Sequence, residues 1–139
     1  MRLVLDTNTA LSGLLWQGTP GKLIDAAKQH EVALFSSTPL LAELLGVMSR
    51  AKFTNMLAAR GLRVQSLFEG YAALVQLVVP AQINPIIVRD PADDAVLACA
   101  LAAQADYIVS GDAHLLDLKR YREIPIITAA QAMQAVTDR

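Results

Sequence analysis

Short apolar runs alternate along this chain with longer stretches whose apolar residues recur every three or four positions. A short apolar run bounded by turn residues predicts a buried strand, whereas recurrence at helical spacing predicts a helix. The predicted strands are Arg2–Asp6, Ala33–Phe35, Ile86–Val88, Tyr107–Val109 and Ile124–Ile127. Strands that alternate with helices favour right-handed crossovers, so the pattern predicts an α/β domain with a mostly parallel sheet.

Helices are predicted between these strands and after the last one. Their ranges are Asn8–Leu15, Pro20–Gln29, Leu40–Ser49, Leu62–Val78, Pro91–Ala103, Ala113–Leu116 and a final helix capped by Thr128. Thr19-Pro20 and Thr38-Pro39 both resemble an N-cap residue followed by proline at the first helical position. We therefore expect helices to begin at these two points.

The composition indicates one domain with a large apolar share. The chain has 139 residues, 54% of them apolar, and a mean hydropathy of +0.38. No apolar run approaches the ~20 residues of a membrane span. Asp6 and Asn8 interrupt the first apolar stretch, which argues against a signal peptide, and the single Cys99 cannot form an intramolecular disulfide. We therefore expect a cytoplasmic protein with a doubly covered sheet and some apolar surface kept for a partner.

Four acidic residues are predicted to meet at one edge of the sheet. Asp6 ends the first predicted strand, and Asp112 follows the fourth. Glu43 and Asp94 fall in the first turns of helices that follow strands. Ligands of parallel α/β sheets bind beyond the carboxyl ends of the strands. Because carboxylates held close together repel one another unless a cation neutralises them, this edge predicts a hard divalent metal ion and phosphoester chemistry.

Three of these acids also have structural explanations. Asp6 could simply cap the following helix, although Asn8 beside it adds an amide oxygen suited to metal or water coordination. Glu43 lies at the edge of an apolar helical stripe, where a glutamate either reaches solvent or points into a polar pocket. Asp112 follows a glycine, and a turn role is common for such a pair.

The acidic cluster before the fifth predicted helix divides in a similar way. Asp90 and Asp93 fit the capping and dipole preferences of a helix N-terminus, so we place them beside the metal ligands rather than among them. Asp94 shares a helix face with Leu97 and Leu101. That face points inward, where a solvated charge is not expected, and Asp94 is therefore the candidate ligand.

The net charge of −1 conceals an uneven distribution. Six of the thirteen acidic residues belong to the predicted site or lie beside it: Asp6, Glu43, Asp90, Asp93, Asp94 and Asp112. The rest of the chain has twelve basic and seven acidic side chains. A basic scaffold around an acidic pocket suits an anionic polymer, although ordinary surface charge explains the numbers equally well. The candidate RNA-binding residues lie in a stretch without carboxylates: Arg50, Lys52, Arg60 and Arg63. A phosphate-binding surface and a solvated helical face are the two interpretations of that stretch.

The order and spacing of these motifs resemble the PIN domain, a family of small metal-dependent ribonucleases. The resemblance rests on Asp6-Thr7-Asn8 after the first strand, Glu43 in the third helix, Asp94 opening its helix, and Ser110-Gly111-Asp112 after the fourth strand. The stretch Asp90–Leu116 is especially similar to the toxins of type II toxin–antitoxin pairs, the VapC-type toxins. Ser110 stands where the family often has threonine, and it keeps the hydroxyl that would support the ligands.

The resemblance implies an α/β/α sandwich with a five-stranded parallel sheet. It also implies Mg²⁺ or Mn²⁺ at the acidic pocket, with Asp6, Glu43, Asp94 and Asp112 as metal-binding and catalytic residues. The implied activity is endonucleolytic RNA cleavage that leaves 5′-phosphate and 3′-hydroxyl ends. The implied partners are an antitoxin protein and a second copy of the chain.

The apolar content agrees with a homodimer. Trp16, Leu14, Leu15, Phe68 and Tyr71 suggest more apolar surface than a monomer of this size hides. We expect the helices after the first strand and before the third to lie at or near the contact. An antitoxin would then place an amphipathic segment in the remaining apolar groove and a basic side chain against the acids.

Other functions share parts of this pattern. A haloacid-dehalogenase-like phosphatase also carries Asp at the end of its first strand, but Asp6-Thr7-Asn8-Thr9 lacks the second acid of its D-x-D-x-T pattern. A receiver-type domain would need an acidic pair and a late lysine, and neither is evident. A non-catalytic binding module of the same fold remains possible if the pocket never binds metal.

Overall fold

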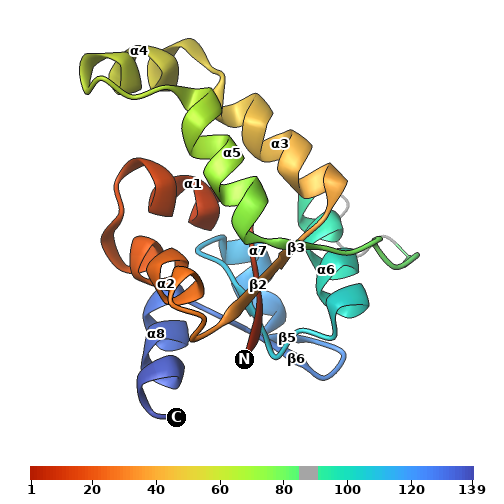
Figure 1. Cartoon of the computed structure of the whole chain (residues 1–139). Coiled ribbons are helices and arrows are strands. Elements are labelled where there is room, and N and C mark those ends of the chain that lie inside the picture. Colours follow the sequence, from red (N-terminus) through yellow and green to blue (C-terminus); the bar gives the residue numbers. More distant parts are fainter. Residues whose placement is uncertain (85–90) are drawn as a thin grey trace.

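The computed structural model describes residues 1–84 and 91–139 and contains a sheet in the order β3-β2-β1-β4-β6-β5 (Figure 1). The strands are β1 (Arg2–Leu5), β2 (Ala33–Ser36), β3 (Gln76–Leu77), β4 (Tyr107–Val109), β5 (Arg120–Tyr121) and β6 (Ile124–Ile127). Every neighbouring pair is parallel except β5 and β6. The predicted mostly parallel α/β fold is confirmed, with six strands among the described residues where five were expected.

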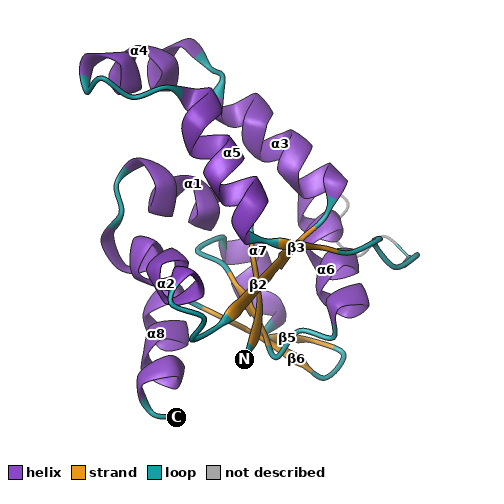
Figure 2. Ribbon diagram, viewed as in Figure 1, coloured by secondary structure: helices purple, strands orange, loops and turns teal. Residues whose placement is uncertain are grey.

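Helices connect the strands and cover the sheet (Figure 2). They are α1 (Thr7–Leu15), α2 (Gly18–Lys28), α3 (Thr38–Met48), α4 (Ala51–Ala59), α5 (Val64–Leu74), α6 (Pro91–Ala103), α7 (Ala113–Leu118) and α8 (Ala129–Thr137). The predicted helix over Pro91–Ala103 and the cap at Thr128 are confirmed. α4 was not predicted, although Phe53 and Leu57, four residues apart and both buried, carried its signal.

The region before α6 differs most from the prediction. The predicted strand Ile86–Val88 lies outside the described residues, as does Asp90. The predicted helix Leu62–Val78 is too long, because α5 ends at Leu74 and Gln76–Leu77 pairs in parallel with Phe35–Ser36 of β2. Val75 adopts an extended backbone at this point. Pairing with the sheet therefore overrides a helical pattern that continued in the sequence.

Two helix starts lie one or two residues away from their predicted positions. α2 begins at Gly18 after Gln17, which has a φ of 63° and makes no side-chain capping bond, so Thr19 is not its N-cap. The N-cap of α3 is Ser37, whose Oγ accepts from the backbone N–H of Leu40 at 3.4 Å. In both helices the proline lies inside the first turn, where its missing N–H costs no helical hydrogen bond.

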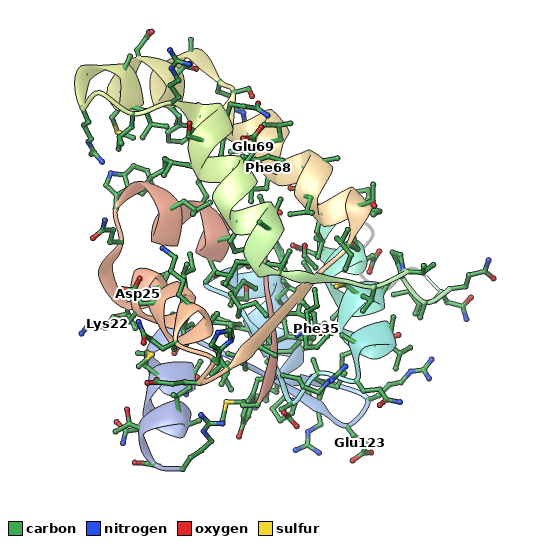
Figure 3. All side chains as sticks on the ribbon, in the orientation of Figure 1. Lys22, Asp25, Phe35, Phe68, Glu69 and Glu123 are labelled. Carbon is green, nitrogen blue, oxygen red and sulfur yellow. The ribbon has the colours of Figure 1, made fainter. Side chains whose placement is uncertain are left out.

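Alternate residues of each strand face opposite layers of the sandwich. Leu3 and Leu5 of β1 pack with buried residues of α1, α2, α5 and α8, whereas Val4 packs with α6 and with Leu115 of α7. Phe35, also in this second cluster, lies in the interior in Figure 3, and the charged side chains of Lys22 and Asp25 are exposed. The sheet is therefore covered on both faces, as the three-layer sandwich requires.

Helix α6 carries the one cysteine of the sequence into this second cluster. Cys99 is fully buried. Burial raises the pKa of its thiol to about 11, against an opposing hydrogen bond with Ser37. The expected role as a small buried residue is confirmed. Among the described residues, no helix has the length and apolar character needed to cross a bilayer.

Helices α3, α4 and α5 form an arm that extends away from the sheet, with α4 at its far end (Figure 1). α3 and α5 pack against each other. Leu57 of α4 is fully buried in the cluster that also contains Leu3 and Leu5 of β1. The base of the arm adjoins the carboxyl end of β1, because Leu40 and Leu44 of α3 and Tyr71 of α5 line a small gap beside Asp6. The arm therefore joins the acidic edge of the sheet to the basic stretch.

Candidate active site

Asp6 is a buried carboxylate fixed at the end of β1. Its side chain is 4% exposed, and it is the N-cap of α1. One carboxylate oxygen accepts from the backbone N–H of Thr9 at 2.8 Å, and the other accepts from the hydroxyl of Ser110 at 2.5 Å. The Asp6 backbone N–H donates to the carbonyl of Val109 at 3.0 Å, which ties the ends of β1 and β4 together. The capping role considered from the sequence is therefore present, together with a contact from a second strand.

Ser110 connects three strand ends. It is 1% exposed, and its backbone N–H donates to the carbonyl of Ile127 in β6 at 2.9 Å. Its hydroxyl donates to Asp6 and accepts from the backbone N–H of Asp112 at 2.9 Å. A serine hydroxyl can do both at once, because it has one donor and two lone pairs. Ser110 therefore positions both aspartates relative to the sheet.

Asp112 is the second acid at this edge. It caps α7, and its carboxylate accepts from the backbone N–H of Leu115 at 3.1 Å. Burial raises the pKa of Asp6 above its ordinary value of 3.8, hydrogen bonds with Ser110 and Thr9 lower it, and the charge of Asp112 raises it further. The charges of these two carboxylates therefore interact at the edge of the sheet.

Tyr71 is a neighbour of Asp6 that the sequence did not reveal. It was expected at an exposed apolar surface, but it is 3% exposed and lines the small gap beside Asp6 and Thr7. Burial, the neighbouring Cys99 and the charge of Asp6 hold the pKa of its phenol well above the usual range. Within the described residues the buried Thr7 hydroxyl, in the same gap, has no hydrogen-bond partner. Only the packing of α5 against α3 and the sheet edge brings Tyr71 here.

The two helical acids lie on α3 and α6, and both are half-buried. Glu43 follows Leu40 by one turn, and Asp94 precedes Leu97 by one turn. Leu40 and Leu97 belong to the same buried cluster, and α3 packs against α6. Asp93, expected in a supporting position, is buried. Within residues 1–84 and 91–139, no three histidine, cysteine or acidic side chains are grouped closely enough to hold a metal ion.

The donors at the sheet edge are suited to a hard cation. Asp6 and Asp112 supply carboxylate oxygens, and no nitrogen or sulfur ligand of a histidine or cysteine adjoins them among the described residues of the gap and the pocket. Such oxygen ligands favour Mg²⁺ or Mn²⁺. Burial and the charge of Asp112 raise the pKa of Asp6 despite its hydrogen bonds, which is the environment in which a nearby cation favours the charged carboxylate. A divalent cation would offset the charge of these two carboxylates, so the chemistry of the donors fits the ion, with two acids rather than three grouped among the described residues.

A pocket of about 370 Å³ opens beside Asp112. It lies between the first two turns of α1 and the first turns of α2, α7 and α8, and its polar lining includes Asn8, Ser12, Ser110 and Thr128. Asn8, expected beside the metal ligands, is exposed there. Ser12 and Thr128 were not singled out as site residues from the sequence, because isolated hydroxyl residues give no signal until the strand ends converge.

The four basic candidates are all exposed on or beside α4, in the arm. Arg50 and Arg63 precede α4 and α5, and neither makes a side-chain capping bond. Lys52 lies 4.8 Å from the ring centre of Phe53. Arg60 donates to the carbonyl of Leu15 at 2.7 Å, so part of its hydrogen-bonding capacity holds the arm against α1.

The fold and the acidic sheet edge place the chain in the class of parallel α/β proteins with an oxygen-rich site beyond the strand ends. The family model described as PIN domain matches residues 2–114, most of the chain. The chain therefore belongs to the PIN domain family. All four predicted metal ligands lie within the matched residues, and the family is the one that the sequence motifs resembled, not the haloacid-dehalogenase family.

A solved structure shares the fold. A chain in the crystal structure of VapBC2 from Rickettsia felis, bound to a DNA fragment from their promoter, superposes with a TM-score of 0.61. The alignment covers 91% of this chain and 97% of that chain, with 17% sequence identity. No match was found among the curated proteins. The likeness to VapBC2 shows that the PIN architecture seen here is also that of a VapBC chain.

Proposed function

We propose that this protein is a metal-dependent endoribonuclease and the toxin of a toxin–antitoxin pair. The observation that carries the proposal is the buried Asp6 carboxylate, fixed by Ser110 and close enough to Asp112 for their charges to interact. Family membership supports nuclease activity. RNA as the substrate, and Mg²⁺ or Mn²⁺ as the cofactor, come from the resemblance to the toxin branch of the family.

The carboxylates would bind the metal ion, and one of them would accept a proton from the attacking water. Asp6 and Asp112 form the centre of the proposed site, and Glu43 and Asp94 complete it from α3 and α6. A bound divalent ion supplies Lewis-acid charge at the scissile phosphate and at the attacking water. One of the acids accepts the proton of that water, while Ser110 keeps Asp6 oriented. Asn8, Asp90, Asp93 and Ser110 are the proposed supporting residues, of which Asp90 lies outside the described residues.

The basic residues of the arm would bind the RNA backbone. Arg50, Lys52 and Arg63 are exposed, and the positive charge they carry faces solvent. Phosphate contacts of this kind position a nucleic acid without reading its sequence. The base of the arm adjoins Asp6, and these cations lie on or beside α4 at its far end (Figure 1), so one RNA strand could contact both.

An antitoxin partner and a homodimer are part of the proposal. The fold neighbour comes from a VapBC2 structure, which supports the antitoxin. Trp16 and Leu62 are 53% and 43% exposed near the arm, which supports an apolar contact. Leu15 and Tyr71, expected to contribute to that surface, are buried in the core of the chain itself. Two of the five residues expected on the apolar surface are therefore not part of it. A cytoplasmic location stays a prediction.

The test is cleavage of single-stranded and structured RNA by the purified chain with Mg²⁺, Mn²⁺ or excess EDTA. We expect cleavage with either metal and none in EDTA. Asp6→Asn should abolish cleavage, whereas Asp25→Asn, at an exposed acid on α2 (Figure 3), should leave it unchanged. Metal-independent cleavage would contradict the proposed mechanism. RNA binding without cleavage would favour the non-catalytic module.

A further inference from the structure

The pocket beside Asp112 is adjacent to the proposed site but has a different chemistry. Ser110 and Asp112 belong to both, so the two share a wall. The pocket volume of about 370 Å³ lies in the range of small-molecule sites, which begins at roughly 300 Å³. Asp112, which lines the pocket, also interacts with Asp6, so the pocket adjoins the place where a phosphate would meet these two acids.

The lining is polar without being basic. Among the described residues that line it, none is lysine or arginine, and the one charged side chain is the Asp112 carboxylate. A phosphate in this position would meet the Asp112 carboxylate and no cationic side chain, and the N-termini of α1, α7 and α8 are already capped by Asp6, Asp112 and Thr128, so a phosphate is disfavoured. The pocket is therefore unsuited to the backbone of a nucleic acid and suited to an uncharged part of it.

The polar side chains of the lining can both donate and accept hydrogen bonds. Asn8 has an amide, and Ser12 has a hydroxyl, so each carries both kinds of group at the pocket wall. The Thr128 hydroxyl accepts from the backbone N–H of Gln131 at 3.2 Å and keeps its own proton to donate. Groups of this kind recognise base edges and ribose hydroxyls. Pro20 and Ala129 add apolar surface against which a base can lie.

We propose that this pocket receives the nucleoside next to the scissile phosphate and gives the nuclease its base preference. The inference rests on the proposed function for its place in the reaction. It adds a binding site for the uncharged ribose and base, built by Asn8, Ser12, Thr128 and Ala129 near the starts of two separate helices, α1 and α8. Residues of the arm contact the phosphates of the RNA, and residues of the pocket select the base.

The pocket can be filled without touching the acids. Ala129→Leu adds bulk at a lining position, and Ala130→Leu adds the same bulk at the next residue, which is exposed and outside the lining. Both are measured in the Asp6→Asn background by fluorescence anisotropy with labelled single-stranded RNA. Thermal unfolding curves check that both leucine variants are folded. The Mn²⁺-induced shift in melting temperature, measured with the native Asp6, controls the metal site.

We expect Ala129→Leu to weaken RNA binding about tenfold, the order of magnitude of a single base contact, while Ala130→Leu leaves it unchanged. Ser12→Ala should narrow the affinity differences among four RNA homopolymers. Equal affinities for the two leucine variants would overturn the inference. Inorganic phosphate that competes with RNA in the native pocket, and no longer competes in Ala129→Leu, would overturn it too.

Cleavage assays distinguish a failure of this inference from a failure of the proposed function. With native Asp6, Ala129→Leu should raise KM and flatten the distribution of cleavage positions on a randomised RNA. If the unmodified protein cleaves no RNA with either metal, the proposed function fails. The anisotropy comparison then still decides whether the pocket binds a nucleoside.

Discussion

The acidic edge of the sheet and the basic arm hold their charges in opposite ways. At the sheet edge, Asp6 and Ser110 are almost fully buried and joined by a short hydrogen bond between residues 104 positions apart. In the arm, Arg50, Lys52 and Arg63 are exposed at or beside helix ends. Arg60 is fastened by its bond to the carbonyl of Leu15.

The difference matches what each region would have to do under the proposed function. Chemistry at a phosphorus atom depends on atoms held within a fraction of an ångström, and rigid strand ends with supporting hydrogen bonds provide this. Contact with a phosphate backbone depends on positive charge over a broad surface, and exposed side chains are sufficient. Substitutions at the sheet edge should therefore alter the reaction, and substitutions in the arm should alter binding.

Among the variants that keep Asp6, the largest effect is expected for the two helical acids. Glu43→Gln or Asp94→Asn should lower the cleavage rate by about 1,000-fold, because several kcal/mol of transition-state stabilisation correspond to that factor. Single-turnover cleavage with Mn²⁺ measures it. Glu69→Gln is the matched control, since Glu69 is exposed on α5 and accepts from the side chain of Gln65 (Figure 3). Full activity of Glu43→Gln and Asp94→Asn would reduce the site to Asp6 and Asp112.

A smaller effect is expected at the supporting hydroxyl. Ser110→Ala should lower activity by roughly 10–100-fold, the usual cost of removing a group that orients a metal ligand. It removes both the donor to Asp6 and the acceptor for the Asp112 N–H. Ser110→Thr keeps the hydroxyl and should retain most of the activity. A Thr variant as impaired as the Ala variant would show that packing, not the hydroxyl, matters at this position.

The arm should respond in binding alone. Charge reversal at Arg50 and Lys52 should weaken RNA binding about tenfold and reduce the salt slope by about 0.7 for each phosphate that is no longer neutralised. Anisotropy titrations at several salt concentrations measure both quantities, and the cleavage rate at saturating RNA should stay the same. An unchanged slope would identify the two residues as a solvated helical face.

The smallest expected effect is the pH dependence of metal-free stability. The pKa of Asp6 is raised in the folded protein, so the folded state binds more protons than the unfolded state above the ordinary value of 3.8. The free energy of unfolding should therefore fall as the pH rises from 3.8 through the raised pKa. Asp6→Asn should remove this slope in urea titrations with EDTA. Mg²⁺ or Mn²⁺ should stabilise the native chain and not the variant at neutral pH.

The local sequence determined the elements whose apolar spacing is by itself typical of a strand or a helix. The strands at Tyr107–Val109 and Ile124–Ile127 and the helix at Pro91–Ala103 are found where the apolar spacing placed them. Asp6 and Asp112 follow strand ends, and strands that run parallel bring such ends to one edge. The class of fold and the general position of these two acids were therefore predictable from short-range patterns.

Only the tertiary structure decided which side chains are neighbours. β3 has two residues and exists because β2 offers it a partner, so no local pattern could have predicted it. Tyr71 was expected at the surface and is buried beside Asp6, because α5 folds back along α3. The bond from Ser110 to Asp6 and the pocket beside Asp112 both require segments about a hundred residues apart to converge. Local conformation follows from the spacing of apolar residues along the chain, whereas such contacts exist only after the whole sheet has formed.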